Sequence, residues 1–144
     1  RFIQLATEIN MEMPNHVLRK VDETLRQAGK SLVNANVLIL GIAYKPNVSD
    51  IRESPAIDLI HLLKRGGAEV AYHDPYVANV EVETCRLESV QLSKDNLRMA
   101  DCVVITTDHD EYDWQWVVDN SRIIVDTRNA TRSVKNGMSR VTKI

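Results

Sequence analysis

The side chains best suited to chemistry gather in one polar stretch, GIAYKPNVSDIRESPA at residues 41–56. It follows directly on the apolar run NVLIL, which has the composition of a buried strand. Lys45 and Arg52 supply two cations, and Ser54 followed by Pro55 is typical of a helix start. Cations beside a helix N-terminus suit a phosphate-bearing ligand. The alternative interpretation is a surface loop that is merely charged.

A further cation, Arg128, follows another strand-like run, IIVDT. Its planar guanidinium can bind a phosphate through two parallel hydrogen bonds. An ion pair with Asp126 is the alternative role for Arg128. For Arg52 the competing role is a local ion pair with Asp50 or Glu53. Both roles of Arg52 can hold at once, because a carboxylate can orient a ligand-binding arginine.

The polar residues that follow the other strand-like runs are predicted to have structural roles. Asp74 follows a second apolar run, where an acid would hold a ribose in a dinucleotide site. The first turn has a single glycine, Gly41, whereas the G-x-G-x-x-G fingerprint needs three, so we expect no whole NAD in the usual pose. We therefore predict a turn capped by Asp74, with His73 packed or hydrogen-bonded in the core. His109, between two aspartates, is predicted to lie in a solvated loop.

Composition excludes several classes of function. A net charge of -2 gives no electrostatic reason to expect nucleic acid or an anionic membrane surface as a partner. No apolar run is long enough for a membrane span. Cys85 and Cys102 lack zinc-ligand spacing, so we expect no metal site, and Cys102 lies in a strand-like run typical of a core. These features fit a protein of the reducing cytoplasm.

The first 28 residues have the pattern of a helix. Apolar residues recur every four positions, at Leu5, Ile9, Met13, Val17, Val21 and Leu25. Pro14 is predicted to kink or split this helix. Its apolar stripe either packs against something outside this chain or folds back on the chain's own sheet. The chain begins without Met, and we interpret it as a piece of a longer protein.

After residue 36, strand and helix patterns alternate. Strands are expected at 37–40, 70–73, 102–106 and 123–126, with a short extra strand near Val80 or Val90 and an edge strand at 139–144. Helices are expected at 55–64, 93–100 and 112–118. This rhythm predicts an α/β fold: a Rossmann-like parallel sheet with helices on both faces, preceded by the N-terminal helix.

Four motifs in order carry a resemblance to a known family. They are AYKPNVSDIRESPA, YHDPY at 72–76, TTDHDEYDW at 106–114 and VDTRNA at 125–130. Together they resemble the C-terminal domain of the UDP-sugar dehydrogenases, over about residues 10–132. These enzymes oxidise the C6 hydroxyl of a nucleotide sugar to a carboxylate with two NAD molecules. The last three motifs favour the branch that acts on UDP-N-acetylhexosamines, with UDP-N-acetylglucosamine or UDP-N-acetylmannosamine as the substrate.

The resemblance implies roles for individual residues. Tyr44, Lys45 and Arg128 correspond to residues that contact the UDP-sugar, and Arg52 corresponds to one that reaches NAD. In the family, NAD is bound mainly by an N-terminal domain that this chain lacks. The catalytic cysteine of the family stands in a G-x-G-G-x-C-x-x-K-D setting, which neither cysteine here has. The fragment is therefore expected to bind substrate and to carry no catalytic residue.

The resemblance also implies an organisation for the chain. Residues 1–30 would be the end of a central dimerisation helix, and residues 31–144 the UDP-sugar-binding domain, so the intact protein would be a homodimer. Two alternatives remain open from the residues alone. One is a stand-alone Rossmann-like regulatory or interaction module without catalysis. The other is a different α/β enzyme, such as a nucleotide-sugar transferase, that uses Lys45 and Arg128 on phosphates.

Overall fold

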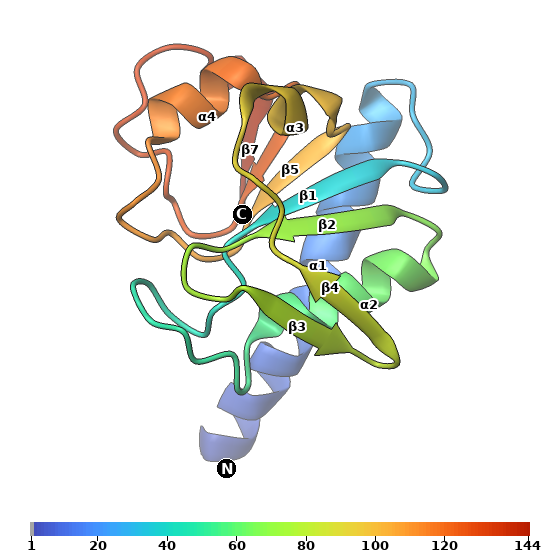
Figure 1. Ribbon diagram of the computed structural model, residues 1–144. Helices are drawn as coiled ribbons and strands as arrows, with labels where there is room; N and C mark the ends of the chain where they lie inside the picture. The colour runs from blue at the N-terminus through green and yellow to red at the C-terminus, as the bar shows by residue number, and fades with distance from the viewer. Residues whose placement is uncertain (1) are drawn as a thin grey trace.

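A five-stranded sheet forms the centre of the protein. The structure is a computed structural model that describes residues 2–144, with side chains from residue 12 onward. The strand order is β2-β1-β5-β6-β7, and every neighbouring pair is parallel (Figure 1). The strands are β1 (Asn36–Leu40), β2 (Glu69–His73), β5 (Cys102–Ile105), β6 (Ile124–Asp126) and β7 (Val141–Lys143). The strand at the chain's end confirms the predicted edge strand.

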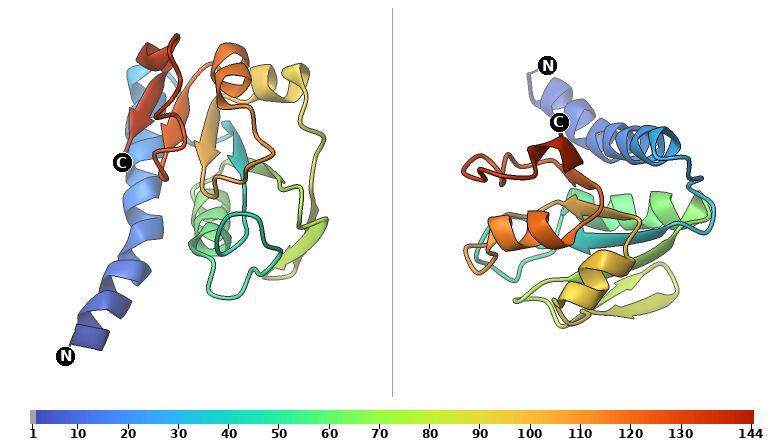
Figure 2. Two further views of the ribbon diagram at one scale, coloured as in Figure 1. Left: turned by 90° about the vertical axis from the view of Figure 1, so that its left-hand side faces the viewer. Right: turned by 90° about the horizontal axis from the view of Figure 1, so that it is seen from above.

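Helices cover both faces of this sheet (Figure 2, right). The helices are α1 (Phe2–Gln27), α2 (Pro55–Arg65), α3 (Lys94–Met99) and α4 (Trp114–Asn120). Ile39 and Val104 belong to the core beneath α1 and α2, whereas Leu38 and Val103 belong to the core beneath α3 and α4. The central strands β1, from Val37 onward, and β5 are buried on both faces, which explains their apolar sequences. The predicted Rossmann-like α/β fold is confirmed.

The second half of α1 packs on the chain's own core. Val17, Val21 and Leu25 are buried together with residues of α2 and the sheet. Of the two predicted alternatives, this half therefore folds back on its own sheet. Of the kink or split predicted at Pro14, the split is wrong, because α1 runs through this residue as one helix, and the kink stays a prediction. Burial of the following turns offsets the missing hydrogen bond. Stripe positions before residue 12 lie outside the described side chains.

Two further features complete the fold. A hairpin of β3 (Asn79–Val82) and β4 (Cys85–Glu88) lies beside β2 and α2 (Figure 1). The extra strand expected near Val80 is present, whereas Val90 lies outside the strands. A short 3-10 helix, η1 (Met138–Arg140), precedes β7. Within residues 2–144, no helix combines the length and apolar character that crossing a membrane requires.

Gly41 approaches Thr107 of a neighbouring loop closely. It has φ of +82°, and a Cβ placed there would lie 2.3 Å from the carbonyl oxygen of Thr107. We expect Gly41→Ala to lower the free energy of unfolding by about 3 kcal/mol or more, because overpacking adds to the cost of left-handed backbone. Urea denaturation measures this change.

Gly29→Ala is the matched control. Gly29 also has positive φ, +77°, but a Cβ placed at this residue would meet nothing within 4 Å. Its substitution should therefore cost only about 1–2 kcal/mol. Equal losses for the two variants would show that the contact with Thr107 does not constrain the loops.

Candidate functional site

Three loops meet at the carboxyl edge of the sheet, where the parallel strands end. They are the β1–α2 loop (residues 41–54), the β5–α4 loop (residues 106–113) and the segment that follows β6 (residues 127–137). In the sheet, β2 lies on one side of β1 and β5 lies on the other. The strand order therefore reverses between β1 and β5. Open α/β sheets bind their ligands at such a point, outside the carboxyl ends of the strands.

A cleft of about 680 Å³ opens at this edge, on the side of α1 and α2. We call it the edge cleft. Its walls come from α1, from the start of α2 with the loop before it, and from the ends of β5 and β6. The lining includes Met13, Val17, Tyr44, Glu53, Thr106 and Arg128. Segments that are far apart in the sequence thus share one hollow.

The start of α2 forms part of this wall. Ser54 Oγ accepts a hydrogen bond from the backbone N–H of Ala56 at 3.3 Å and donates one to the carbonyl of Ile42 at 2.7 Å. The predicted cap residue and the proline at the first helical position are confirmed. Pro55 and Ala56 line the cleft. The first turn of a helix carries partial positive charge, which favours an anion, whereas Asp58 in this turn and Glu53 before it bring negative charge to the same wall.

Arg128 reaches the cleft from a loop that a buried carboxylate organises. Asp126, with 0% exposure, accepts hydrogen bonds from the backbone N–H groups of Arg128, Ala130 and Thr131. The predicted alternative, a side-chain ion pair between Arg128 and Asp126, is wrong because these N–H groups occupy that carboxylate. Instead, Arg128 Nε lies 3.6 Å from Asp108 Oδ1. The guanidinium is thereby held beside the cleft by a partly exposed acid.

Tyr44 and Lys45 occupy the neck of the β1–α2 loop. The backbone N–H of Tyr44 donates to the carbonyl of Asp50 at 2.6 Å, which closes the loop at its base. Tyr44 is 50% exposed and lines the edge cleft. Lys45 is exposed on the same loop, outside the lining. Since β1 and β6 run parallel, Lys45 and Arg128 follow strand ends at the same edge of the sheet.

Arg52 forms the local ion pair that was its alternative role. Its Nε and Nη2 atoms donate to the two carboxylate oxygens of Asp50 at 3.1 and 3.0 Å. The hydrogen bond from Arg52 lowers the pKa of Asp50 to about 2. The Arg52 side chain is 88% exposed and stands outside the lining of the cleft. A role toward NAD stays a prediction.

Asp74 and His109 form a buried pair that the sequence did not predict. The predicted solvated position of His109 is wrong, because this side chain is 0% exposed. Asp74 Oδ2 lies 2.9 Å from His109 Nε2 and accepts from the backbone N–H groups of Ile42 and Ala43. The predicted turn at Asp74 is present, since its Oδ1 accepts from Tyr76 N at 2.8 Å. The turn is only one of the roles of this carboxylate.

A signal for this pair did exist in the sequence. Asp74 follows β2 and His109 lies in the loop after β5, and these strands flank β1 on either side. An acid and an imidazole at such positions can meet beneath the loop that leaves β1. The flanking residues Asp108 and Asp110 had instead suggested a solvated position for His109. His73, in contrast, is hydrogen-bonded as predicted, with its Nδ1 at 3.0 Å from the hydroxyl of Tyr112, and its burial lowers its pKa.

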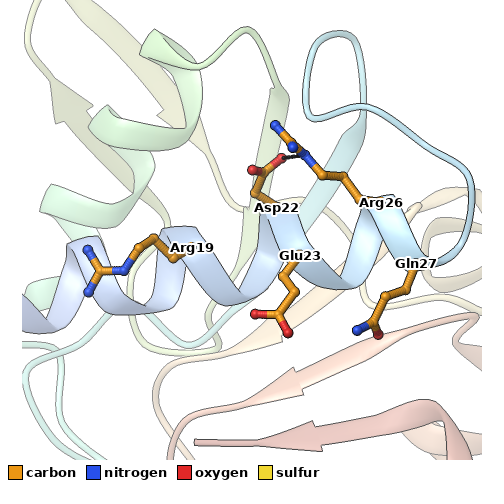
Figure 3. A pocket seen from close by; sticks show the side chains of 5 residues that line it. All are labelled: Arg19, Asp22, Glu23, Arg26 and Gln27. Atoms are coloured by element: carbon orange, nitrogen blue, oxygen red, sulfur yellow. Dashed lines mark hydrogen bonds and ion pairs between the residues drawn. The ribbon is translucent and has the colours of Figure 1, made fainter.

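A second hollow, of about 440 Å³, lies on the exposed side of α1 (Figure 3). Its lining residues are Arg19, Asp22, Glu23, Arg26 and Gln27. Arg26 Nε donates to Asp22 Oδ1 at 3.2 Å, so these two charges offset one another. All five come from one helix, and we assign no site to them. Among the described residues, no group of three His, Cys, Asp or Glu side chains is placed to hold a metal ion.

Comparison with known proteins gives this geometry a context. The model of the UDP-glucose/GDP-mannose dehydrogenase family, UDP binding domain, matches residues 38–133. UDP-N-acetyl-D-mannosamine dehydrogenase of Methanococcus maripaludis is 34% identical over 112 residues, which are 78% of this chain and 24% of that protein. UDP-glucose 6-dehydrogenase of Haloferax volcanii is 33% identical over 132 residues, covering 89% of this chain and 30% of that protein.

Solved structures agree with the sequence relatives. UDP-D-ManNAc dehydrogenase from Pyrococcus horikoshii superimposes with a TM-score of 0.80 at 28% identity, covering 99% of this chain and 33% of that one. NDP-N-acetyl-D-galactosaminuronic acid dehydrogenase from Methanosarcina mazei gives 0.82 at 25% identity, with 100% and 31% covered. This chain thus spans about a quarter to a third of the length of these relatives. Since the family model matches more than half of it, the chain belongs to the UDP-glucose/GDP-mannose dehydrogenase family and contains the UDP binding domain.

Proposed function

We propose that this chain is the C-terminal, UDP-sugar-binding part of an NAD-dependent UDP-sugar 6-dehydrogenase. The intact enzyme would oxidise the sugar C6 hydroxyl to a carboxylate. The substrate would be UDP-N-acetylmannosamine or UDP-N-acetylglucosamine; the names of several relatives support the first of these. This part binds the nucleotide sugar and supplies no catalytic residue.

The observation that carries the proposal is the edge cleft. A nucleoside diphosphate needs positive charge for its phosphates and flat or apolar surface for the rest. Arg128 and the first turn of α2 supply the positive charge, and the exposed ring of Tyr44 supplies the flat surface. Lys45 stands next to Tyr44 and reaches the same ligand as a point charge. Glu53 and Asp58 also line the cleft and can accept hydrogen bonds from sugar hydroxyls.

The cofactor and the partner follow from the same proposal. NAD would be held mainly by a domain outside this chain, with Arg52 reaching it while Asp50 orients the guanidinium. Residues 1–30 would be the end of a dimerisation helix and residues 31–144 the binding domain, giving a homodimer. The part of α1 that extends beyond the sheet supports this role (Figure 2, left). The two free cysteines fit a cytoplasmic enzyme.

Titration of this chain with UDP tests the proposed site. We expect UDP to bind weakly, with a Kd on the order of 1 mM, because only part of the cleft is present. Chemical shift changes caused by UDP in NMR spectra should centre on Tyr44, Lys45 and Arg128. Arg128→Gln should weaken binding about tenfold, since it removes a charge-assisted hydrogen bond to phosphate.

Arg65→Gln provides the matched control, because it removes the same charge at the far end of α2. We expect it to leave UDP binding unchanged within about twofold, by the small effect of distant exposed charges. If both variants lost the same UDP affinity, the effect of Arg128→Gln would be one of net charge and not of a contact with phosphate. No binding of UDP by the folded chain would favour the stand-alone module over the dehydrogenase part. NAD reduction by this chain alone would contradict the assigned roles.

Thiol labelling tests the statement that neither cysteine is a catalytic residue. Burial raises the pKa of Cys102 to about 12, whereas Cys85 is exposed on the β3–β4 hairpin. In the folded chain we expect iodoacetamide to modify Cys85 and not Cys102, since the thiolate is the reacting form. UDP should not change the rate, because neither cysteine lines the edge cleft. Rapid modification of Cys102 in a folded Cys85→Ser variant, or its protection by UDP, would contradict this assignment.

A further inference from the structure

The exposed part of the β1–α2 loop is fastened to the β5–α4 loop by one residue, Asn47. Its backbone N–H donates to His109 Nδ1 at 2.8 Å. Its side-chain amide exchanges two hydrogen bonds with Asp110, at 3.0 and 2.9 Å. Asn47 has φ of +66°, so the chain turns sharply at the fastened residue. Tyr44 and Lys45 lie just before this point.

These contacts fix the state of the imidazole. His109 Nδ1 accepts a hydrogen bond, so it carries a lone pair and no proton. The proton of the neutral ring is therefore on Nε2, which donates to Asp74 Oδ2 at 2.9 Å. The imidazole is buried between Asn47 and Asp74, and its centre lies 4.9 Å from the centre of the Tyr76 ring. His109 thus connects a carboxylate in the core to the backbone of an exposed loop.

We propose that His109 is a positioning residue: its Nδ1 atom sets the place of the loop that presents Tyr44 and Lys45 to the nucleotide. This inference rests on the proposed function for the identity of the ligand. The link to Asn47 is separable from the core. Asp74 keeps its bonds from Ile42, Ala43 and Tyr76 without His109, so the start of the loop stays in place when the link is lost.

Two substitutions separate the two nitrogens of the ring. In His109→Asn, the amide oxygen takes the place of Nδ1 and can still accept from Asn47, but nothing reaches Asp74. In His109→Gln, the amide nitrogen takes the place of Nε2 and can still donate to Asp74, but nothing accepts from Asn47. Both variants leave a cavity at a buried site, so both should lower the melting temperature.

The experiment compares these variants in the 144-residue chain by two NMR measurements: hydrogen exchange at the Asn47 amide and the Kd for UDP. His109→Asn should keep both values within about twofold of the unaltered chain. His109→Gln should expose the Asn47 amide to exchange and weaken UDP binding by about five- to tenfold, the value of one lost hydrogen bond.

The proposal is overturned if His109→Gln retains the exchange rate and the UDP affinity of the unaltered chain. It is also overturned if both variants lose affinity in proportion to their loss of thermal stability, which is the result of a purely structural role. Failure of the unaltered chain to bind UDP would count against the proposed function. In that case the exchange rates still decide whether His109 Nδ1 positions the loop.

Discussion

The carboxylate of Asp74 holds the carboxyl edge of the sheet together from inside the fold. It accepts hydrogen bonds from the backbone of the β1–α2 loop, from its own turn and from His109. A buried charge is costly unless it is fully hydrogen-bonded, and these partners supply what water would otherwise supply. The path by which the chain leaves β1 depends on this group together with the hydrogen bond from Ser54 Oγ to the carbonyl of Ile42. The loop that carries Tyr44 and Lys45 starts from these contacts.

A buried carboxylate also organises the segment after β6, which carries Arg128. Asp126 is buried at the end of β6 and accepts backbone hydrogen bonds from the segment that contains Arg128. In both places a buried acid shapes the backbone, while an exposed cation is left at the surface of the edge cleft or beside it. Each acid directs its oxygens at backbone N–H groups, and Arg128 pairs instead with Asp108. An anionic ligand in the edge cleft would therefore compete with Asp108 for Arg128.

The sequence predicted the fold well because local pattern and tertiary structure agree there. Apolar runs became the buried parallel strands, and Ser54 with Pro55 began α2 as expected. Tyr44 and Arg128 were brought to one cleft because parallel strands end at a common edge. What failed depended on contacts between distant segments. His109 looked solvated beside two aspartates, but contacts with Asn47, Asp74 and Tyr76 from other loops bury it. Pro14 was predicted to kink or split the helix, and α1 runs through this residue without a split.

A crystal structure of this chain with UDP bound tests the central claim most directly. The account predicts the diphosphate in the edge cleft, with Arg128 and the first turn of α2 on its oxygens and Tyr44 against the nucleotide. A nucleotide bound elsewhere on the molecule, with Arg128 still turned to Asp108 and the cleft empty, would contradict it.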